Sequence, residues 1–266
     1  MTTQTRAPIA AAKPTRFSPR RFLALAGAET KILLRNRTAL FVVATMPVFM
    51  ALFFMTFTKL PSLGMLLTGM ILGMALLFVI YYTMVTSLVA RREQLVLKRL
   101  NSGEATPIEI LLAPAVPLWV ATVVQTGLAA LAARYALDSG ALHWWALIPA
   151  VVLGSAAWTG LAVLSAPLTR TVESAQLTTM PAILVALMLS GLSLPLALMP
   201  TAVQQVAMLL PLAPVVDLVS YAFTGMNLIG EQVSATAMVK PVVVLLAWTA
   251  GSMWLGMRIF RWDPRT

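Results

Sequence analysis

The chain has 266 residues, of which 59% are hydrophobic and only 11% are charged, and its mean hydropathy is +0.87. Soluble domains are about 45–50% apolar and about 25% charged, so this composition indicates a membrane protein. The sequence has no Cys and a single His, His143, which excludes disulfides, thiolate metal sites and histidine clusters. The net charge of +10 does not indicate nucleic-acid binding, because the cations flank apolar segments instead of alternating with stacking aromatics.

Long intervals without charged residues predict six membrane-spanning helices. About 20 apolar residues are enough for a helix to cross the hydrocarbon core, and prolines divide the longest interval after its first part. We therefore expect an all-α integral membrane protein whose six-span domain covers residues 38–258. The predicted spans are 38–58, 63–89, 107–135, 144–168, 177–196 and 241–257.

Segments outside the spans also have recognisable patterns. Residues 18–37 carry apolar residues at helical spacing and predict an amphipathic helix at the membrane interface. Residues 203–210 and 215–223 predict short helices before the last span, which dip into the outer leaflet or pack on the bundle. The composition of residues 1–17, which are rich in Thr, Ala, Pro and Lys or Arg, predicts a disordered basic tail. Residues 259–266 are expected to form a cytoplasmic tail.

The distribution of Lys and Arg predicts the orientation in the membrane. With both termini in the cytoplasm, every basic residue except Lys59, Arg134 and Lys240 lies on the cytoplasmic side, as the positive-inside rule requires. No cleavable signal peptide is expected, because the first apolar run follows a long basic segment and continues at spanning length. We expect a multi-pass protein of the cell (plasma or inner) membrane, with the charged segment RREQLVLKRLNSGEATPIEI, 91–110, facing the cytoplasm.

Several kinds of site have no counterpart in the sequence. The phosphate-binding pattern G-x-x-x-x-G-K-[ST] does not occur, and neither do H-E-x-x-H or G-x-S-x-G, so no catalytic, cofactor-binding or metal-binding residues are expected. The carboxylates Glu109, Glu173, Asp217 and Glu231 fall near the ends of predicted spans. This placement disfavours an ion-coupled carrier, which uses carboxylates inside the membrane.

The charged segment resembles the stretch after the second span of type-2 ABC exporter permeases, the ABC-2 transmembrane subunit family. Other motifs occur in the same order as in that family, and the similarity covers about residues 20–258. The matching features are RE at 92–93, LKRL at 97–100, TPIEILLA at 106–113, Pro47 in the first span, LSGLSLP at 189–195, and LLPLAP at 209–214 followed by Asp217.

The resemblance implies the permease subunit of an ATP-driven exporter. Such permeases work in pairs, and each rests on a separate cytoplasmic ABC ATPase that binds ATP and Mg²⁺. The chain itself would therefore be neither an enzyme nor a carrier of a cofactor. Its partners would be that ATPase, a second permease copy or paralogue, and the lipid bilayer, with no nucleic acid.

Within this family resemblance, residues 93–100 correspond to the cytoplasmic coupling helix, and the interfacial helix at 18–37 also contacts the ATPase. The leucines of the coupling helix would dock in an apolar groove while the cations pair with acidic rims, whereas an ordinary positive-inside loop needs only the cations. The residues expected to couple to the ATPase are Arg92, Glu93, Leu95, Leu97, Lys98, Arg99, Leu100 and Glu29.

The hydroxyl side chains of the second span have two interpretations. They bond between helices, or they line a translocation path, to which Gln125 of the third span would also belong. The cargo of such a path would be a hydrophobic or amphipathic compound (a drug, lipid or peptide) that leaves the cytoplasm or inner leaflet. The alternative function is a six-span scaffold or immunity protein that binds a partner without transport. The possible path residues are Tyr82, Thr83, Thr86 and Gln125.

Overall fold

The computed structural model describes residues 16–55, 63–135, 137–138 and 141–263. Within these ranges the regular structure is helical, apart from one isolated bridge between Met226 and Gln232. Five of the described helices are long and apolar enough to cross a membrane, and a sixth span is present if two helices joined by a sharp bend count as one. The chain is therefore an all-helical, multi-pass membrane protein with five or six spans.

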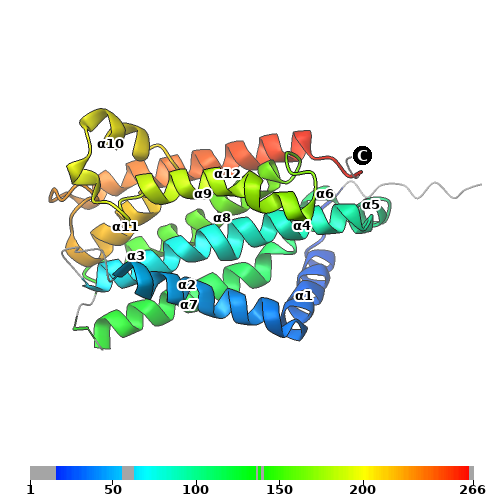
Figure 1. The fold of residues 1–266 in the computed structure, drawn as a ribbon, viewed down its shortest axis with the longest axis horizontal. Coiled ribbons are helices and arrows are strands. Elements are labelled where there is room, and N and C mark those ends of the chain that lie inside the picture. Colours follow the sequence, from blue (N-terminus) through cyan, green and yellow to red (C-terminus); the bar gives the residue numbers. More distant parts are fainter. Residues whose placement is uncertain (1–15, 56–62, 136, 139–140, 264–266) are drawn as a thin grey trace, which may run out of the picture.

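The bent pair lies at the beginning of the described chain. Helix α1 (Pro19–Arg35) meets α2 (Arg37–Met55) at an angle of 87°, and the two are blue in Figure 1. Asn36 leaves the helical conformation between them, and its side-chain oxygen accepts a hydrogen bond from the backbone N of Ala39 at 3.0 Å, which caps α2. A helix at 18–37 was predicted, whereas its place at a membrane interface stays a prediction. The last three residues of the predicted first span, 56–58, lie outside the described residues.

The second span is the central helix of the bundle. It consists of α3 (Leu63–Met74), a π-helical segment η1 (Ala75–Tyr82) and α4 (Thr83–Glu93), which together form one helix of 31 residues. Nearly all side chains of α3 and η1 are buried. At 1.5 Å per residue the helix is about 46 Å long, which exceeds the roughly 30 Å of the hydrocarbon core. The sequence predicted a helix at 63–89 but not its π-helical middle.

The third and fourth spans agree with their predicted ranges within three residues. The third contains α6 (Pro107–Leu112) and α7 (Ala115–Tyr135), with Pro114 in the short break between them. The fourth begins with the 3₁₀ turn η2 (Trp144–Ala146) and continues as α8 (Leu147–Ser165).

The fifth span is shifted from its predicted range of 177–196. Helix α9 (Val172–Leu189) begins earlier because Thr171 and Ser174 form a reciprocal capping box, with backbone-to-hydroxyl distances of 3.2 and 3.0 Å. It ends earlier because the chain leaves the helix at Gly191, whose φ of +80° lies in the left-handed region that favours glycine.

Short helices follow, as the sequence predicted. They are η3 (Leu196–Leu198), α10 (Thr201–Ala207) and α11 (Ala213–Thr224). Helix α11 is buried along almost its whole length and packs against α3 and α8. The turn η4 (Ala235–Met238) then leads into the last span, α12 (Val239–Ile259).

Different helices and turns form the two ends of the bundle. At one end, here called the α5 end, α1, the short helix α5 (Val96–Asn101), the α8–α9 turn and the C-terminal part of the described chain lie together (Figure 1). At the other end, here called the α10 end, α10 and α11 lie beside the start of α3. The predicted tail after 258 packs partly on the bundle, because Phe260 is buried and contacts Trp262 with ring centroids 5.1 Å apart.

Small residues allow α8 and α12 to pack closely along their length. A Cβ added at Gly256 would lie 2.9 Å from the backbone N of Leu164 and 3.1 Å from the backbone C of Val163, so the neighbouring helix is nearly in backbone contact. Small residues at helix crossings are a common way to hold membrane helices together.

Replacing Gly256 with Ala is expected to lower the free energy of unfolding by about 2 kcal/mol, because the new methyl group meets backbone that cannot rotate away. Gly251→Ala on the same helix is the matched control, since nothing lies within 4 Å of an added Cβ there. That change should be neutral or stabilising. Thermal unfolding of the purified protein in detergent compares them, and equal unfolding temperatures would show that the α8–α12 contact is not tight at Gly256.

Candidate functional site

The charged segment occupies the α5 end, where the central helix stops. The predicted coupling helix, 93–100, is divided: its first residue ends α4, and α5 begins at Val96. Leu95 between them is in the left-handed conformation, with φ of 60° and ψ of 12°, which breaks the helix. The leucines then differ in position, because Leu95 is exposed, Leu97 is buried in the core and Leu100 is partly buried against it.

Arg92 is buried at the α5 end and binds the turn that connects α8 to α9. Its guanidinium donates to the backbone carbonyls of Ala166 at 3.0 Å, Thr169 at 2.5 Å and Arg170 at 3.2 Å. Ala166 is the C-cap residue of α8, where carbonyls lack partners within the helix and carry partial negative charge, and Thr169 and Arg170 lie in the turn that follows. A buried cation therefore fixes the position where α8 turns toward α9.

Glu93 binds the other side of the same turn. Its Oε1 accepts a hydrogen bond from the backbone N of Val172, the first residue of α9, at 3.2 Å. A carboxylate is favourable at a helix N-terminus, where backbone N–H groups are free and the helix dipole is positive. The neighbouring residues Arg92 and Glu93 thus hold the two helix ends of the α8–α9 turn to the end of α4.

Helix α1 is held to α4 by an ion pair between Glu29 and Arg91. Both guanidinium nitrogens Nη1 and Nη2 face the two carboxylate oxygens, and the side chains are only 13% and 18% exposed. This contact explains why a carboxylate lies on the apolar face of α1. Glu29 was predicted to contact the ATPase, and in this chain its carboxylate is engaged by Arg91.

A second carboxylate holds the beginning of α1 to α6. Glu109 is fully buried, and its Oε1 accepts from the backbone N of Ser18 at 2.5 Å and pairs with Arg21 at 3.3 Å. Its Oε2 accepts from the backbone N of Thr106 at 2.8 Å, and the Thr106 hydroxyl accepts from the backbone N of Glu109 at 3.4 Å. Glu109 therefore completes the cap of α6 and anchors α1 at the same time.

Four of the predicted coupling residues are exposed, and Glu93 is the one among them that binds the start of α9. The other three, Leu95, Lys98 and Arg99, are here called the α5 surface. Lys98 lies 2.6 Å from Asp263, but both side chains are more than half exposed, so this pair contributes little stability. The side chain of Arg99 has no hydrogen bond or ion pair within the described parts of the chain. An apolar side chain beside two cations is therefore available for a partner.

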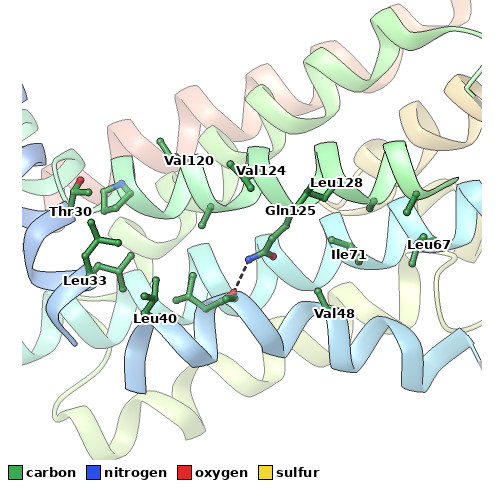
Figure 2. A pocket seen from close by; sticks show the side chains of 17 residues that line it. Thr30, Leu33, Leu40, Val48, Leu67, Ile71, Val120, Val124, Gln125 and Leu128 are labelled. Carbon is green, nitrogen blue, oxygen red and sulfur yellow. Dashed lines mark hydrogen bonds between the residues drawn. The ribbon is translucent and has the colours of Figure 1, made fainter. Parts of the chain in front are cut away.

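A long groove lies between α1, α2, α3 and α7 (Figure 2). Its volume is about 710 Å³, and its lining is apolar except for Thr30 and Gln125. The Gln125 amide donates to the backbone carbonyl of Val43 at 2.7 Å, as the dashed line in Figure 2 shows. Pro47 stands four residues after Val43 and has no N–H, so Gln125 supplies the donor that α2 lacks.

The structure does not bring the four predicted path residues into one cavity. Gln125 lines the groove, whereas Thr83 lines a smaller cavity of about 110 Å³ beside Glu29 and Arg91. The hydroxyls of Thr83 and Thr86 donate to backbone carbonyls of their own helix, at 2.9 and 3.0 Å. Tyr82 is partly buried against the core. A role of these residues in translocation stays a prediction.

Sequence reasoning missed Arg21, Arg91 and Glu109 as members of this site. Glu109 had a readable signal, because Thr106 followed three residues later by Glu is a capping box. The partners of Arg21 and Arg91 are distant in sequence and carried no local signal. Among the described residues, no group of three or more His, Asp or Glu is placed to hold a metal ion.

Comparison with known proteins identifies the family. The sequence model of the ABC-2 type transporter family matches residues 20–224, which is most of the chain and includes α1 through α11. A comparison with curated protein sequences finds no match. Since the match covers more than half of the residues and agrees with the all-helical, multi-pass fold, the chain belongs to the ABC-2 type transporter family.

Proposed function

We propose that this chain is the permease subunit of an ATP-driven exporter and that its α5 end faces the cytoplasm, with both termini on that side. Membership of the ABC-2 type transporter family supports a membrane permease with an ABC ATPase as partner. The observation that carries the proposal is the bonding around α5, in which Arg91, Arg92 and Glu93 connect α4 to α1, α8 and α9. A displacement of α5 would therefore be passed through the end of α4 to α1, α8 and α9.

The α5 surface is the part of this site that would touch the ATPase. Leu95 would enter an apolar groove while Lys98 and Arg99 pair with acidic residues around it. Arg92, Glu93, Leu97 and Glu29 would act indirectly, by holding the helices behind that surface, and Leu100 would support α5 from its partly buried position. ATP and Mg²⁺ would be bound by the ATPase, and this chain would not hydrolyse ATP.

The cargo would be a hydrophobic or amphipathic compound, such as a drug, lipid or peptide, moved out of the cytoplasm or the inner leaflet. The scarcity of charged side chains within the described spans supports this class. Exposed apolar residues on α9, including Leu177, Leu184 and Val185, are available to lipid or to a second permease subunit, a copy or a paralogue. The pair of subunits would then surround the cargo path.

Leu95→Asp combined with Arg99→Glu is expected to reduce co-purification of the cognate ABC ATPase about tenfold, because a buried apolar contact and a charge pair are lost together. ATP hydrolysis by the mixed subunits should then no longer respond to the permease. Arg258→Glu is the control, since Arg258 is an exposed cation in the last turn of α12, stacks on Trp254 at 4.1 Å and lies outside the α5 surface.

The same experiment separates the exporter from the alternative scaffold or immunity protein. A scaffold without transport predicts that the purified chain neither retains the ATPase nor changes its rate of hydrolysis. Wild-type protein that behaves in this way would overturn the exporter proposal. If the Leu95→Asp, Arg99→Glu variant retains the ATPase as well as the Arg258→Glu control does, the exporter proposal stands. The α5 surface is then refuted as the docking site of the ATPase.

A further inference from the structure

The groove between α1, α2, α3 and α7 has the length and composition of a site for a hydrocarbon chain. On α7 its lining extends from Pro117 to Ala132, which is about 22 Å at 1.5 Å per residue. One leaflet contributes about half of the roughly 30 Å hydrocarbon thickness, so the groove is longer than one acyl chain needs. Val120, Val124 and Leu128 line it and are more than half exposed, so the groove opens sideways.

The interior of the groove offers no free backbone group where α2 would otherwise expose one. Pro47 leaves the carbonyl of Val43 without its helical donor, and the Gln125 amide occupies that carbonyl. The contact removes one unsatisfied backbone group from the wall, and the Gln125 Oε1 stays buried there without a hydrogen-bond partner among the described residues. Apart from Gln125 and Thr30, apolar side chains line the groove.

Cations stand at the end of the groove that α1 closes. Figure 2 shows Thr30 and Leu33 of α1 at that end, with Val48 and Leu67 toward the other. Lys31, Arg35 and Arg37 are exposed, and within the described ranges none of them has an ion pair or a side-chain hydrogen bond.

These cations are close in sequence to residues that line the groove. Lys31 follows the lining residue Thr30, Arg35 follows the lining residue Leu34, and Arg37 precedes the lining residue Leu40 by one turn. Flexible basic side chains beside a membrane span reach the phosphates of anionic lipids. Glu29, the nearest carboxylate on α1, is engaged by Arg91 and does not oppose them.

We propose that the groove holds one acyl chain of an anionic phospholipid from the leaflet at the α5 end, with the lipid phosphate on Lys31, Arg35 and Arg37. The hydrocarbon accounts for the apolar walls and the phosphate accounts for the unpaired cations. This lipid is a resident of the chain and needs neither ATP nor the ATPase. The proposal therefore stands or falls independently of the exporter function.

The test uses the full chain in phosphatidylcholine vesicles that contain a trace of phosphatidylglycerol with a photoactivatable acyl chain. Adducts mapped by mass spectrometry are expected on α2 and α7 along the groove, about tenfold more than with photoactivatable phosphatidylcholine, because three cations favour the anionic headgroup. Arg35→Gln with Arg37→Gln should remove most of this preference. Arg16→Gln with Arg20→Gln, which changes exposed cations at the other end of α1, should leave it unchanged.

A second pair of variants tests the groove itself. Val124→Trp fills the groove and should reduce its labelling at least fivefold, since the side chain lines the cavity. Val123→Trp is the matched control, because the two valines are neighbours on α7, 52% and 53% exposed, and Val123 lies outside the groove lining. Its labelling should equal that of the wild type.

Three outcomes would overturn the proposal. Equal labelling by the two lipids would show that the cations do not select a phosphate. Labelling spread evenly over the lipid-facing sides of α9 and α12 would show that the groove is ordinary membrane boundary. Disulfide cross-linking between two copies of the Val124→Cys variant, with no lipid adduct in the groove, would show that a second subunit covers the groove.

Discussion

Arg92→Met is expected to destabilise the chain by about 3–5 kcal/mol and to abolish ATP-driven transport. The guanidinium is buried and donates to three backbone carbonyls at the turn between α8 and α9. Methionine keeps the apolar stem but leaves those carbonyls without a charged donor, and each lost partner of a buried polar group costs about 1–3 kcal/mol. Thermal unfolding in detergent and cargo transport in proteoliposomes measure the two effects.

Arg99→Met is the control for this prediction. Arg99 follows Arg92 by seven residues, but its side chain is exposed and has no partner within the described ranges. Its replacement should change stability by no more than about 0.5 kcal/mol, and any loss of transport should accompany weaker binding of the ATPase. An Arg92→Met protein that unfolds at the wild-type temperature would contradict the structural role given to Arg92.

The positions of the long helices could be predicted because the signal is local. A run of apolar residues between charges is visible in the sequence, and it locates a span whatever its neighbours are. The limits of α9 were less accessible, since they depend on a capping box at Thr171 and on the turn at Gly191. The π-helical segment in the second span, Ala75–Tyr82, is largely buried at the centre of the bundle and left no such signal.

The charged segment could be located in the sequence, but the direction of its side chains could not. Arg91, Arg92 and Glu93 are consecutive, and a helix rotates about 100° from one residue to the next. They consequently reach three different elements: α1, the end of α8 and the start of α9. The charges of Arg92 and Glu93 looked available for a partner protein because their hydrogen-bond partners lie more than seventy residues away in the chain.

Pro47 and Gln125 show that partners inside the membrane were also not predictable from the sequence. That a proline in α2 leaves one carbonyl without a donor follows from the sequence alone. Which side chain supplies the replacement depends on how α2 packs against α7, and Gln125 was therefore assigned only to a possible cargo path. Its hydrogen bond to Val43 adds a role in the structure of the groove wall.

Charge reversal at the Glu29–Arg91 pair is the sharpest test of how α1 is connected to α4. Glu29→Arg should place two guanidinium groups together in a site where both wild-type side chains are less than a fifth exposed. The expected loss of stability is about 2–3 kcal/mol, with at least a tenfold loss of transport, because an unpaired buried charge is strongly unfavourable. Arg91→Glu should behave in the same way.

The double variant, Glu29→Arg with Arg91→Glu, restores opposite charges and should recover most of the stability and transport, giving a coupling energy of about 1–3 kcal/mol in a double-mutant cycle. Arg134→Glu is the control in the last turn of α7, where the exposed Arg134–Asp138 pair should tolerate reversal without a measurable change. Strictly additive effects of the two single changes would show that the ion pair does not hold α1. Recovery of stability without recovery of transport would show that the pair fixes the position of α1 but does not pass movement to it from α4.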